Sequence, residues 1–371
     1  MTKVLMITHR FIFGGIEKLL LDMFENRNNH DIHYDLLTLI TEKDTKLIKK
    51  VLALGVGYYC LELDKHNTLE RQVHHYRTLY KFIKKNNYDV VHINITSYAR
   101  ALDMLVVKKA GIKKRIIHSH SADERETLSR KILKPMKKLY DYTATDFLAC
   151  SDNAAKYLFS KKIFEEKKYT VINNGIDVPK YVFSNIERNR IRASLGLNDG
   201  EMIIGHIGRL TEAKNHEFLL EVYYEIYKSN SNSKLLLVGD GELKNAIIEK
   251  INKLGIQKHV IMYGASSEIS ALLSSMDIFL FPSKWEGLGI AVIEAQCNGL
   301  PCYISENIPQ TAAITSNIRQ YSIIKGAKWW AEMILKEKNI RVNETDKIRK
   351  AGYDICYSVS QLEDIYKKGK L

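Results

Sequence analysis

The stretch DIFLFPSKWEGLGIAVIEAQCNGLPCYIS, residues 277–305, decides the fold. It opens with an apolar run over 277–281 that is typical of a buried strand, and a loop containing two glycines follows. Residues 290–297 then show the spacing of apolar side chains expected for a helix, and 301–305 form a second apolar run. Strand, helix and strand in this order predict a βαβ unit with parallel strands.

Apolar runs alternate with helical patterns along most of the chain. In the C-terminal half we expect further strands over residues 202–207, 234–238 and 260–263, and helices over 217–227, 243–254 and 268–274. In the N-terminal half we expect strands over residues 4–8, 89–95, 115–118 and 146–150, and helices over 17–24, 73–85 and 99–110. This alternation predicts an α/β protein with two doubly wound parallel sheets in tandem.

The alternation stops near Asn173-Asn174-Gly175. Residues 178–200 are polar, contain Pro179 and lack an apolar run, so they predict an interdomain linker. We therefore expect an N-terminal domain over residues 1–177 and a C-terminal domain over residues 201–359.

The composition limits the class of protein. The 371 residues suggest two or three domains, and contents of 45% apolar and 27% charged residues are ordinary for a globular protein. No run approaches the roughly 20 apolar residues that span a bilayer, and the first apolar run is too short for a signal peptide. The five cysteines are an odd number without C-x-x-C spacing, so we expect a reducing, cytoplasmic location and no zinc site.

The net charge of +13 is spread unevenly. Residues 1–180 hold 32 Lys and Arg against 21 Asp and Glu, so most of the excess lies in the N-terminal half. Basic surfaces attract nucleic acid, anionic membranes or anionic small molecules, although a solvated lysine-rich surface has the same composition. The two densest clusters are Lys108, Lys109, Lys113, Lys114 and Arg115, and Lys131, Lys134, Lys137 and Lys138.

The loop after the 277–281 strand carries the strongest candidate site, because ligands of such sheets bind beyond the carboxyl ends of the strands. Gly287 and Gly289 allow backbone amides to approach a ligand, and the following helix N-terminus favours an anion. Glu286 lies in the loop and Glu294 inside the helix, so one carboxylate can meet a sugar hydroxyl while the other binds a ribose. A capped helix with solvated glutamates is the alternative.

The segment after the 202–207 strand, Gly208 to Asn215, carries two cations. Arg209 offers a planar guanidinium and Lys214 a point charge, a combination that suits a diphosphate. Two further glycines, Gly239 and Gly264, also follow strands and either form turns or line a nucleotide pocket.

The N-terminal half offers Gly14 and Gly15 after its first strand, and His118 and His120 at the end of its third. A histidine in a cleft can be a general base, a hydrogen-bond donor or a metal ligand, while a structural role is the common alternative. We favour a functional role for His120, and no nearby carboxylate completes a metal site.

Several motifs are absent from the sequence. It contains no G-x-x-x-x-G-K-[ST], which argues against a P-loop NTPase, and no G-x-G-x-x-G after a strand, which argues against a dinucleotide redox cofactor. It also contains no G-x-S-x-G, the nucleophile elbow of α/β-hydrolases. It also lacks D-x-D, so a diphosphate bound through a carboxylate-held metal is not supported, and the Arg209 and Lys214 cations can replace the metal.

Five segments together resemble the retaining glycosyltransferases of family four, and most of all the bacterial capsular and exopolysaccharide enzymes. The resemblance covers nearly the whole chain, and its most specific part is the E-x7-E pattern from Glu286 to Glu294. The segments are EGLGIAVIEAQCNGLP (286–301), GRLTEAKN (208–215), VINNGID (171–177), VGDGEL (238–243) and GGIEK (14–18).

The resemblance implies the GT-B fold, with two Rossmann-like domains facing a cleft, and sugar transfer from a nucleotide diphosphate without an essential metal or other cofactor. Arg209 and Lys214 match the pair that binds the donor diphosphate, and Glu286 matches the glutamate near the donor sugar. Glu294 matches the ribose-binding glutamate. Donor-binding positions are then Gly208, Gly239, Gly264, Gly287, Leu288, Gly289 and Glu294.

The N-terminal domain matches the acceptor domain of that family. Gly14 and Gly15 match its glycine loop near the acceptor and phosphate, and either His118 or, as we prefer, His120 matches its cleft histidine. The last helix, within 360–371, is implied to cross back onto this domain.

We therefore expect a retaining enzyme that uses a nucleotide-sugar donor, with UDP favoured as the nucleotide. The basic N-terminal half suits a lipid-diphosphate-linked acceptor and peripheral attachment to the anionic inner face of the cell membrane. A GT-B nucleotide-sugar epimerase is one alternative. A basic nucleic-acid-binding protein is another, but no recognised nucleic-acid module occurs, so nucleic acid is not an expected partner.

Overall fold

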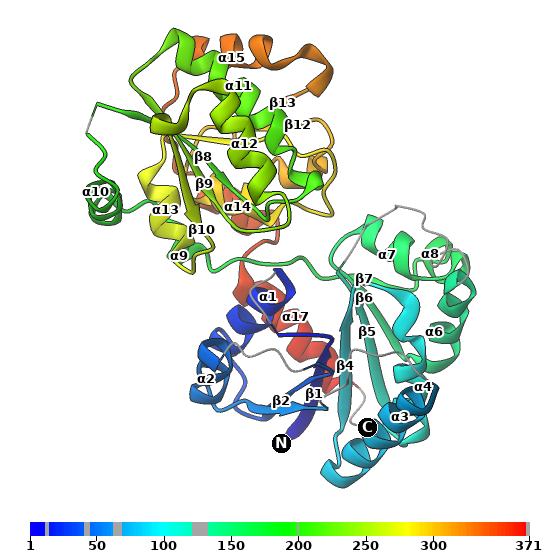
Figure 1. The fold of residues 1–371 in the computed structure, drawn as a ribbon. Coiled ribbons are helices and arrows are strands. Elements are labelled where there is room, and N and C mark those ends of the chain that lie inside the picture. Colours follow the sequence, from blue (N-terminus) through cyan, green and yellow to red (C-terminus); the bar gives the residue numbers. More distant parts are fainter. Residues whose placement is uncertain (12–14, 41–44, 62–68, 121–132, 199, 369–371) are drawn as a thin grey trace. The chain divides into compact units, whose positions relative to one another are not determined.

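The computed structural model describes residues 1–11, 15–40, 45–61, 69–120, 133–198 and 200–368. These residues form two compact units (Figure 1). Unit 1 comprises Met1–Ile176 and Gly352–Leu371, and unit 2 comprises Asp177–Ala351. Each unit is built on its own parallel sheet, so two doubly wound domains follow one another as the sequence predicts.

Unit 1 contains a parallel sheet of seven strands in the order β3-β2-β1-β4-β5-β6-β7. The order reverses between β1 and β4, which is typical of a doubly wound sheet. The strands are β1 (Thr2–Thr8), β2 (Ile32–Thr38), β3 (Gly57–Cys60), β4 (Val90–Ile95), β5 (Lys114–Ser119), β6 (Asp146–Ala149) and β7 (Thr170–Val171).

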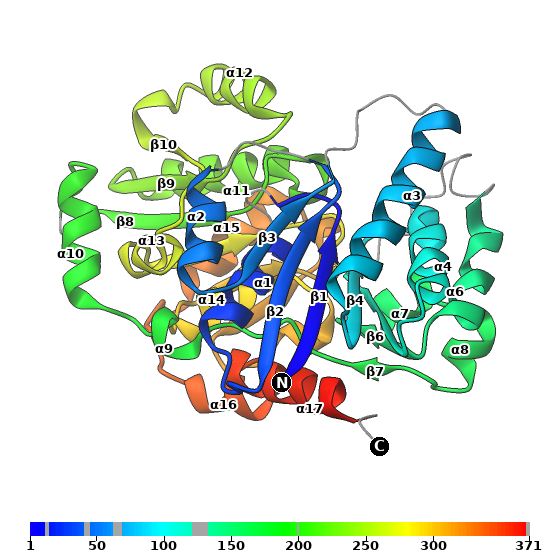
Figure 2. The ribbon, with the colours of Figure 1, turned by 90° about the horizontal axis from the view of Figure 1, so that it is seen from below.

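Helices cover both faces of this sheet, as Figures 1 and 2 show. One face packs against α3 (Leu69–Asn86), α4 (Ala101–Lys109), α6 (Lys137–Thr143), α7 (Asp152–Leu158) and α8 (Lys161–Glu165). The other face packs against α1 (Gly15–Glu25), α2 (Thr45–Ala53) and α17 (Ile355–Lys367). Two short 3-10 turns, η1 (Tyr98–Arg100) and η2 (Lys134–Met136), precede α4 and α6.

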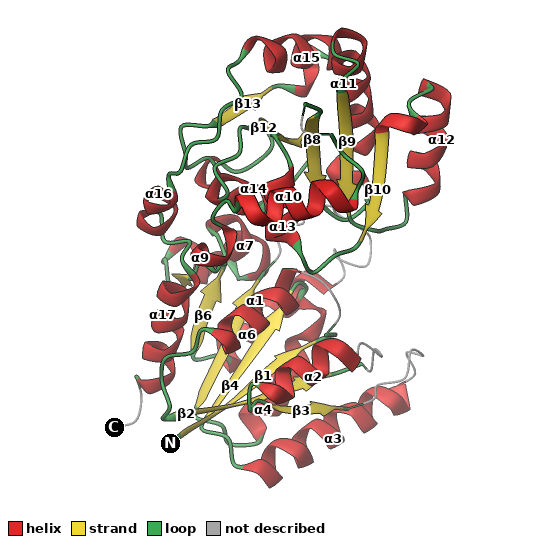
Figure 3. Cartoon of the chain, turned by 90° about the vertical axis from the view of Figure 1, so that its left-hand side faces the viewer, coloured by secondary structure: helices red, strands yellow, loops and turns green. Residues whose placement is uncertain are grey.

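Unit 2 contains a parallel sheet of six strands in the order β10-β9-β8-β11-β12-β13. The arrows of β8, β9 and β10 point the same way in Figure 3. All the carboxyl ends therefore lie along one edge of the sheet. The strands are β8 (Met202–Ile207), β9 (Ser233–Val238), β10 (Val260–Gly264), β11 (Ile278–Phe281), β12 (Cys302–Ser305) and β13 (Ile318–Tyr321).

The helices of unit 2 complete the second doubly wound domain. α11 (His216–Ser229), α12 (Lys244–Leu254) and α15 (Ala327–Lys336) share one apolar core, and α14 (Ile290–Cys297) packs against β11 and β12. The remaining α-helices are α9 (Val178–Tyr181), α10 (Asn185–Ser194), α13 (Ile269–Ser275) and α16 (Thr345–Lys350).

The structure differs from the prediction of a linker over 178–200, because α9 and α10 belong to unit 2. Arg188 of α10 donates through Nη1 to the carbonyl oxygens of Ser274, Ser275 and Met276 at the end of α13, and through Nη2 to Asp277 Oδ1. These bonds satisfy carbonyls that a helix end leaves unpaired. Because polar side chains hold α10 against the end of α13, the segment does not need an apolar run.

The α17 helix belongs to unit 1 although all of unit 2 precedes it in the sequence. It begins at Ile355, five residues earlier than the expected 360, because the Asp354 side chain caps it by accepting from Cys356 N at 3.0 Å. Val359, Leu362 and Tyr366 of α17 are buried in the core that α1 also fills. The segment entering α17 pairs with Ile176 through a parallel bridge to Asp354.

Candidate active site

Two segments at the carboxyl edge of the unit 2 sheet lie side by side. They are residues 208–215, after β8, and residues 282–289, after β11. Lys284 N donates to Ala213 O at 2.8 Å, and Asn215 Nδ2 donates to Pro282 O at 3.1 Å. Both segments were singled out from the sequence, and the structure brings them together.

Lys214 and Glu286 form an ion pair between these segments, in which Lys214 Nζ donates to Glu286 Oε1. Only 17% of the Lys214 side chain and 12% of the Glu286 side chain are exposed. The Lys214 ammonium also lies 4.6 Å from the centre of the Phe281 ring. The ion pair and the ring together hold the lysine in one place, which a catalytic cation requires.

Arg209 differs from Lys214 in being exposed. Its guanidinium makes no hydrogen bond or ion pair with any residue in the described part of the chain. The neighbouring Gly208 is tightly packed, since a Cβ there would lie 3.1 Å from both His206 Nε2 and Lys214 Cε. One fixed cation and one exposed cation therefore lie on the same short loop, an arrangement that can bind a diphosphate.

The helix α14 begins directly after the loop that carries Glu286. Gly289 is its N-cap at φ 82°, a left-handed conformation that favours glycine. Gly287 and the buried Leu288 precede it, and Glu294 lies inside the helix with 3% exposure. The first backbone N–H groups of a helix are unpaired and attract anions, so a phosphate can bind at this end.

The loops after β9 and β10 extend the same edge. Gly239 has φ 145°, and a Cβ there would lie 1.9 Å from Gly208 O, so only glycine fits. Gly239 N donates to Gly264 O at 2.9 Å, and Gly264 itself has φ 85° with open space beside it. Of the five predicted glycines of unit 2, Gly264 ends β10 and the other four follow β8, β9 and β11.

Two buried histidines beside Lys214 were missed from the sequence. His206 Nδ1 donates to Leu280 O at 2.9 Å, and the ring centres of His206 and His216 are 4.9 Å apart. Burial and then the Lys214 charge lower the pKa of His216 to about 4, so it is neutral at pH 7. Their position at either end of the 208–215 segment is the signal that could have identified them.

The predicted histidines of unit 1 form a cluster with a third, His92 on β4. His92 Nε2 lies 3.2 Å from His118 Nδ1, and the rings of His118 and His120 are 4.0 Å apart. His92 Nδ1 is hydrogen-bonded to the Tyr366 hydroxyl at 2.7 Å. Burial lowers the pKa of His92 to about 3 and that of His120 to about 4, so both are neutral at pH 7.

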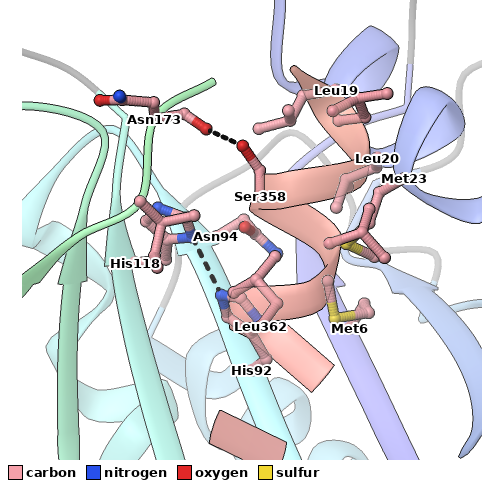
Figure 4. A pocket seen from close by; sticks show the side chains of 13 residues that line it. Met6, Leu19, Leu20, Met23, His92, Asn94, His118, Asn173, Ser358 and Leu362 are labelled. Atoms are coloured by element: carbon pink, nitrogen blue, oxygen red, sulfur yellow. Dashed lines mark hydrogen bonds between the residues drawn. The ribbon is translucent and has the colours of Figure 1, made fainter. Parts of the chain in front are cut away.

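His118 and His120 have different surroundings. His118 is buried and lines a pocket in unit 1 with apolar side chains of α1 and α17, as Figure 4 shows. His120, just beyond β5, is partly exposed, and its Nε2 donates to Asn94 Oδ1 at 2.9 Å. The partly exposed ring at the strand end is the better candidate for contact with a substrate. Gly15 is the first residue of α1, whereas Gly14 lies outside the described residues.

No group of three or more His, Cys, Asp or Glu among the described residues could hold a metal ion. None of the helices in that part of the chain is both long and apolar enough to cross a membrane.

Family models match nearly the whole chain. Residues 13–180 match the model "Glycosyltransferase Family 4", and residues 187–353 match "Glycosyl transferases group 1". The chain belongs to the family-four glycosyltransferases. The resemblance read from the sequence is thereby confirmed, and the glycosyltransferase has the expected two-domain GT-B architecture.

Individual proteins are similar to this glycosyltransferase over most of their length. The capsular polysaccharide biosynthesis glycosyltransferase CapH of Staphylococcus aureus is 26% identical over 99% of both chains. An Escherichia coli UDP-Gal:alpha-D-GlcNAc-diphosphoundecaprenol alpha-1,3-galactosyltransferase is 28% identical over 79% of this chain and 76% of its own. The crystal structure of Anabaena Alr3699/HepE with UDP and glucose superposes with a TM-score of 0.78 at 17% identity, over 98% of this chain and 99% of that one.

Proposed function

We propose that this glycosyltransferase moves a sugar, with retention, from a UDP-sugar to a lipid-diphosphate-linked acceptor in cell-surface polysaccharide biosynthesis. The names of the relatives support this substrate class, since one acts on a diphosphoundecaprenol-linked sugar and another belongs to capsular polysaccharide biosynthesis. UDP is bound in the crystal structure of HepE, which shares the fold. The single observation that carries the proposal is the Lys214–Glu286 pair beside the exposed Arg209.

Unit 2 stabilises the leaving group in this proposal. When the bond between the anomeric carbon and the diphosphate breaks, negative charge grows on the diphosphate oxygen. Lys214, Arg209 and the amides at the start of α14 are the groups that meet this charge. Because two cations provide positive charge here, we propose that transfer needs no metal or other cofactor.

The carboxylates and His120 bind the sugars. Glu286 fixes Lys214 and accepts from a hydroxyl of the donor sugar, and Glu294 binds the ribose hydroxyls. His120 is neutral because of its lowered pKa, so it hydrogen-bonds a sugar hydroxyl without adding charge. The acceptor hydroxyl oxygen bonds to the anomeric carbon on the face from which the diphosphate leaves, and its proton passes to the departing diphosphate oxygen. This gives retention without a covalent intermediate.

Transfer assays test the proposal directly. The chain is incubated with UDP-, GDP- and ADP-sugars, with and without a prenyl-diphosphate-linked sugar, in buffer containing EDTA. We expect UDP release that depends on the acceptor, survives EDTA and gives a product of retained anomeric configuration. Equal donor turnover without any acceptor would instead favour the epimerase alternative, and dependence on added divalent metal would contradict the metal-independent step.

The proposed acceptor class also implies attachment to the inner face of the membrane. Some side chains of the two basic clusters make internal contacts, so we propose that the remaining exposed lysines bind the membrane. Lys114 Nζ donates to Lys368 O, and Arg115 donates to Thr143 O and Ile112 O, so both are committed to internal contacts. Lys108 and Lys137 lie over aromatic rings, and Lys131 lies outside the described residues. The exposed lysines of the two clusters are Lys109, Lys113, Lys134 and Lys138, near the exposed Tyr142.

Vesicle co-sedimentation tests the proposed attachment. We expect binding to vesicles with anionic lipid and little binding to neutral vesicles, with the difference lost at high salt. Glutamate at Lys109, Lys113, Lys134 and Lys138 should abolish the difference, whereas glutamate at the exposed Lys253 and Lys258 of unit 2 should not. Equal binding of the wild type to both vesicles would refute electrostatic attachment.

A further inference from the structure

Two basic side chains meet where the strand order of unit 1 reverses. β1 and β4 are neighbours, but the chain continues from β1 to β2 on one side and from β4 to β5 on the other (Figure 1). In doubly wound sheets, ligands bind outside the carboxyl ends of the strands at this point. His9 directly follows β1, and Arg100 ends the η1 turn that follows β4.

Arg100 and His9 are joined by a hydrogen bond across this point, in which Arg100 Nη2 donates to His9 Nδ1 at 2.9 Å. Partial burial, then the charges of Arg100 and Arg10, lower the pKa of His9 to about 4. The imidazole is therefore neutral at pH 7. Because Nδ1 accepts from Arg100, the ring proton is on Nε2, which is a donor.

A buried carboxylate lies behind the arginine. Asp103 is 1% exposed, and its Oδ2 lies 3.9 Å from Arg100 Nη1. Its Oδ1 lies 2.6 Å from Nε2 of the buried His75 on α3, so the carboxylate is itself held in place. The Arg100 side chain keeps 28% exposure. Arg100 is thus held by His9 and Asp103 while part of its side chain reaches solvent.

We propose that Arg100 and His9 bind a phosphate group of the lipid-linked acceptor, a step that rests on the proposed function. A planar guanidinium can donate two parallel hydrogen bonds to a phosphate, and a neutral imidazole can donate a third. An arginine already held by His9 and Asp103 loses little conformational freedom on binding. The nearby charge of exposed Arg10 adds to the attraction for an anion.

Binding of geranyl diphosphate, a prenyl diphosphate without a sugar, tests this site. Calorimetric titrations are made with saturating UDP present, so that the Arg209 and Lys214 segment is occupied. We expect Arg100→Gln to weaken geranyl diphosphate binding by about tenfold or more, as for loss of a charge-assisted contact. His9→Gln should weaken it less, and Arg100→Lys should retain part of the affinity because the charge remains.

The matched control is Arg77→Gln, which removes one exposed charge from α3 of the same unit and should change binding less than twofold. UDP affinity should be unchanged in every variant. If Arg100→Gln binds geranyl diphosphate as tightly as the wild type does, the proposed site is wrong. If Arg100→Gln loses affinity for UDP instead, Arg100 binds a phosphate of the donor and not of the acceptor. If Arg100→Gln does not fold, His9→Gln and Arg100→Lys decide the same question.

These titrations involve no turnover, so they separate the site from the proposed reaction. A chain that binds geranyl diphosphate through Arg100 but transfers no sugar contradicts only the proposed function. A chain that transfers sugar with an unchanged KM for acceptor in Arg100→Gln contradicts only this site.

Discussion

The two units present different chemistry at the carboxyl edges of similar parallel sheets. In unit 2 the edge carries Arg209 and the Lys214–Glu286 ion pair, supplied by two segments of a few residues each. In unit 1 neutral histidines that contact one another run from His92 inside β4 to His120 just beyond the end of β5. Formal charge in unit 2 suits stabilisation of a leaving group. The neutral histidines of unit 1 suit recognition of hydroxyl groups, and the Arg100–His9 pair at the same edge suits a phosphate. The same sheet topology can therefore present groups for leaving-group stabilisation or for acceptor recognition, depending on the loops that follow its strands.

The largest expected effect is in the charged edge. Lys214→Ala should lower the transfer rate by roughly 10²–10³, about 3–4 kcal/mol, because it removes a cation that we propose stabilises the leaving group. It also leaves Glu286 without its partner. The measurement is kcat with saturating donor and acceptor.

Lys284→Ala is the matched control for this substitution. Lys284 lies on the adjacent segment and pairs with Glu212 at 3.3 Å, but its side chain is 43% exposed. It should retain a rate within about twofold, since exposed pairs contribute at most about 1 kcal/mol. Equal rates in the two variants would mean that Lys214 has no special role in the transfer step.

A smaller effect is expected from the packing beneath the charged edge. Gly239→Ala places a Cβ 1.9 Å from Gly208 O, so the loop that carries Arg209 must shift. We expect a loss of about 1–3 kcal/mol in the free energy of unfolding and weaker UDP binding. Urea unfolding and UDP titration measure the two quantities. Gly200→Ala, whose nearest atom would be Asn232 Nδ2 at 3.7 Å, should change neither.

A further effect is the pH dependence of the histidine cluster of unit 1. His92 and His120 have pKa values of about 3 and 4 in the fold against 6.5 when unfolded, so the unfolded chain binds more protons between these values. Their contribution to stability is complete above pH 6.5. It falls on acidification through pH 5 by up to about 1.4 kcal/mol per pH unit for each histidine.

Urea unfolding at pH 7.5 and pH 5 measures this dependence. His120→Asn should lose part of the difference between the two pH values, whereas His30→Asn, at an exposed position, should retain all of it. Equal differences in both variants would mean that His120 is not kept neutral by the fold.

Much of the fold follows from apolar runs, and the exceptions have physical reasons. All nine expected strands are confirmed. Eight of them are central parallel strands, which are covered on both faces, and the ninth, β10, lies at a sheet edge. The missed strands β3, β7 and β13 are short and lie at sheet edges, where fewer apolar residues are required. β2 was missed because Asp35 interrupts its pattern, although the carboxylate is buried and accepts from the Tyr88 hydroxyl at 2.8 Å.

Those parts of the candidate site that directly follow a strand were predictable from the sequence. The segments around Arg209 and Glu286 each lie directly after a buried strand, so the sequence placed them at the same edge. Their direct pairing through Lys214 depends on packing between residues 72 apart, which no local pattern encodes. The Arg100–His9 contact joins residues 91 apart and was missed for the same reason.

The late position of α17 has a consequence for synthesis. Its side chains Ile355, Val359, Leu362 and Tyr366 complete a core whose other members lie before residue 177. A ribosome adding about 5–20 residues per second makes all of unit 2 before it makes this helix. Unit 2 can therefore fold during translation, whereas unit 1, although made earlier, still lacks the helix that covers part of one apolar face. Unit 2 can thus complete its core before unit 1 does. A nonsense mutation before residue 355 would remove α17 and leave the N-terminal half exposed to aggregation and proteolysis.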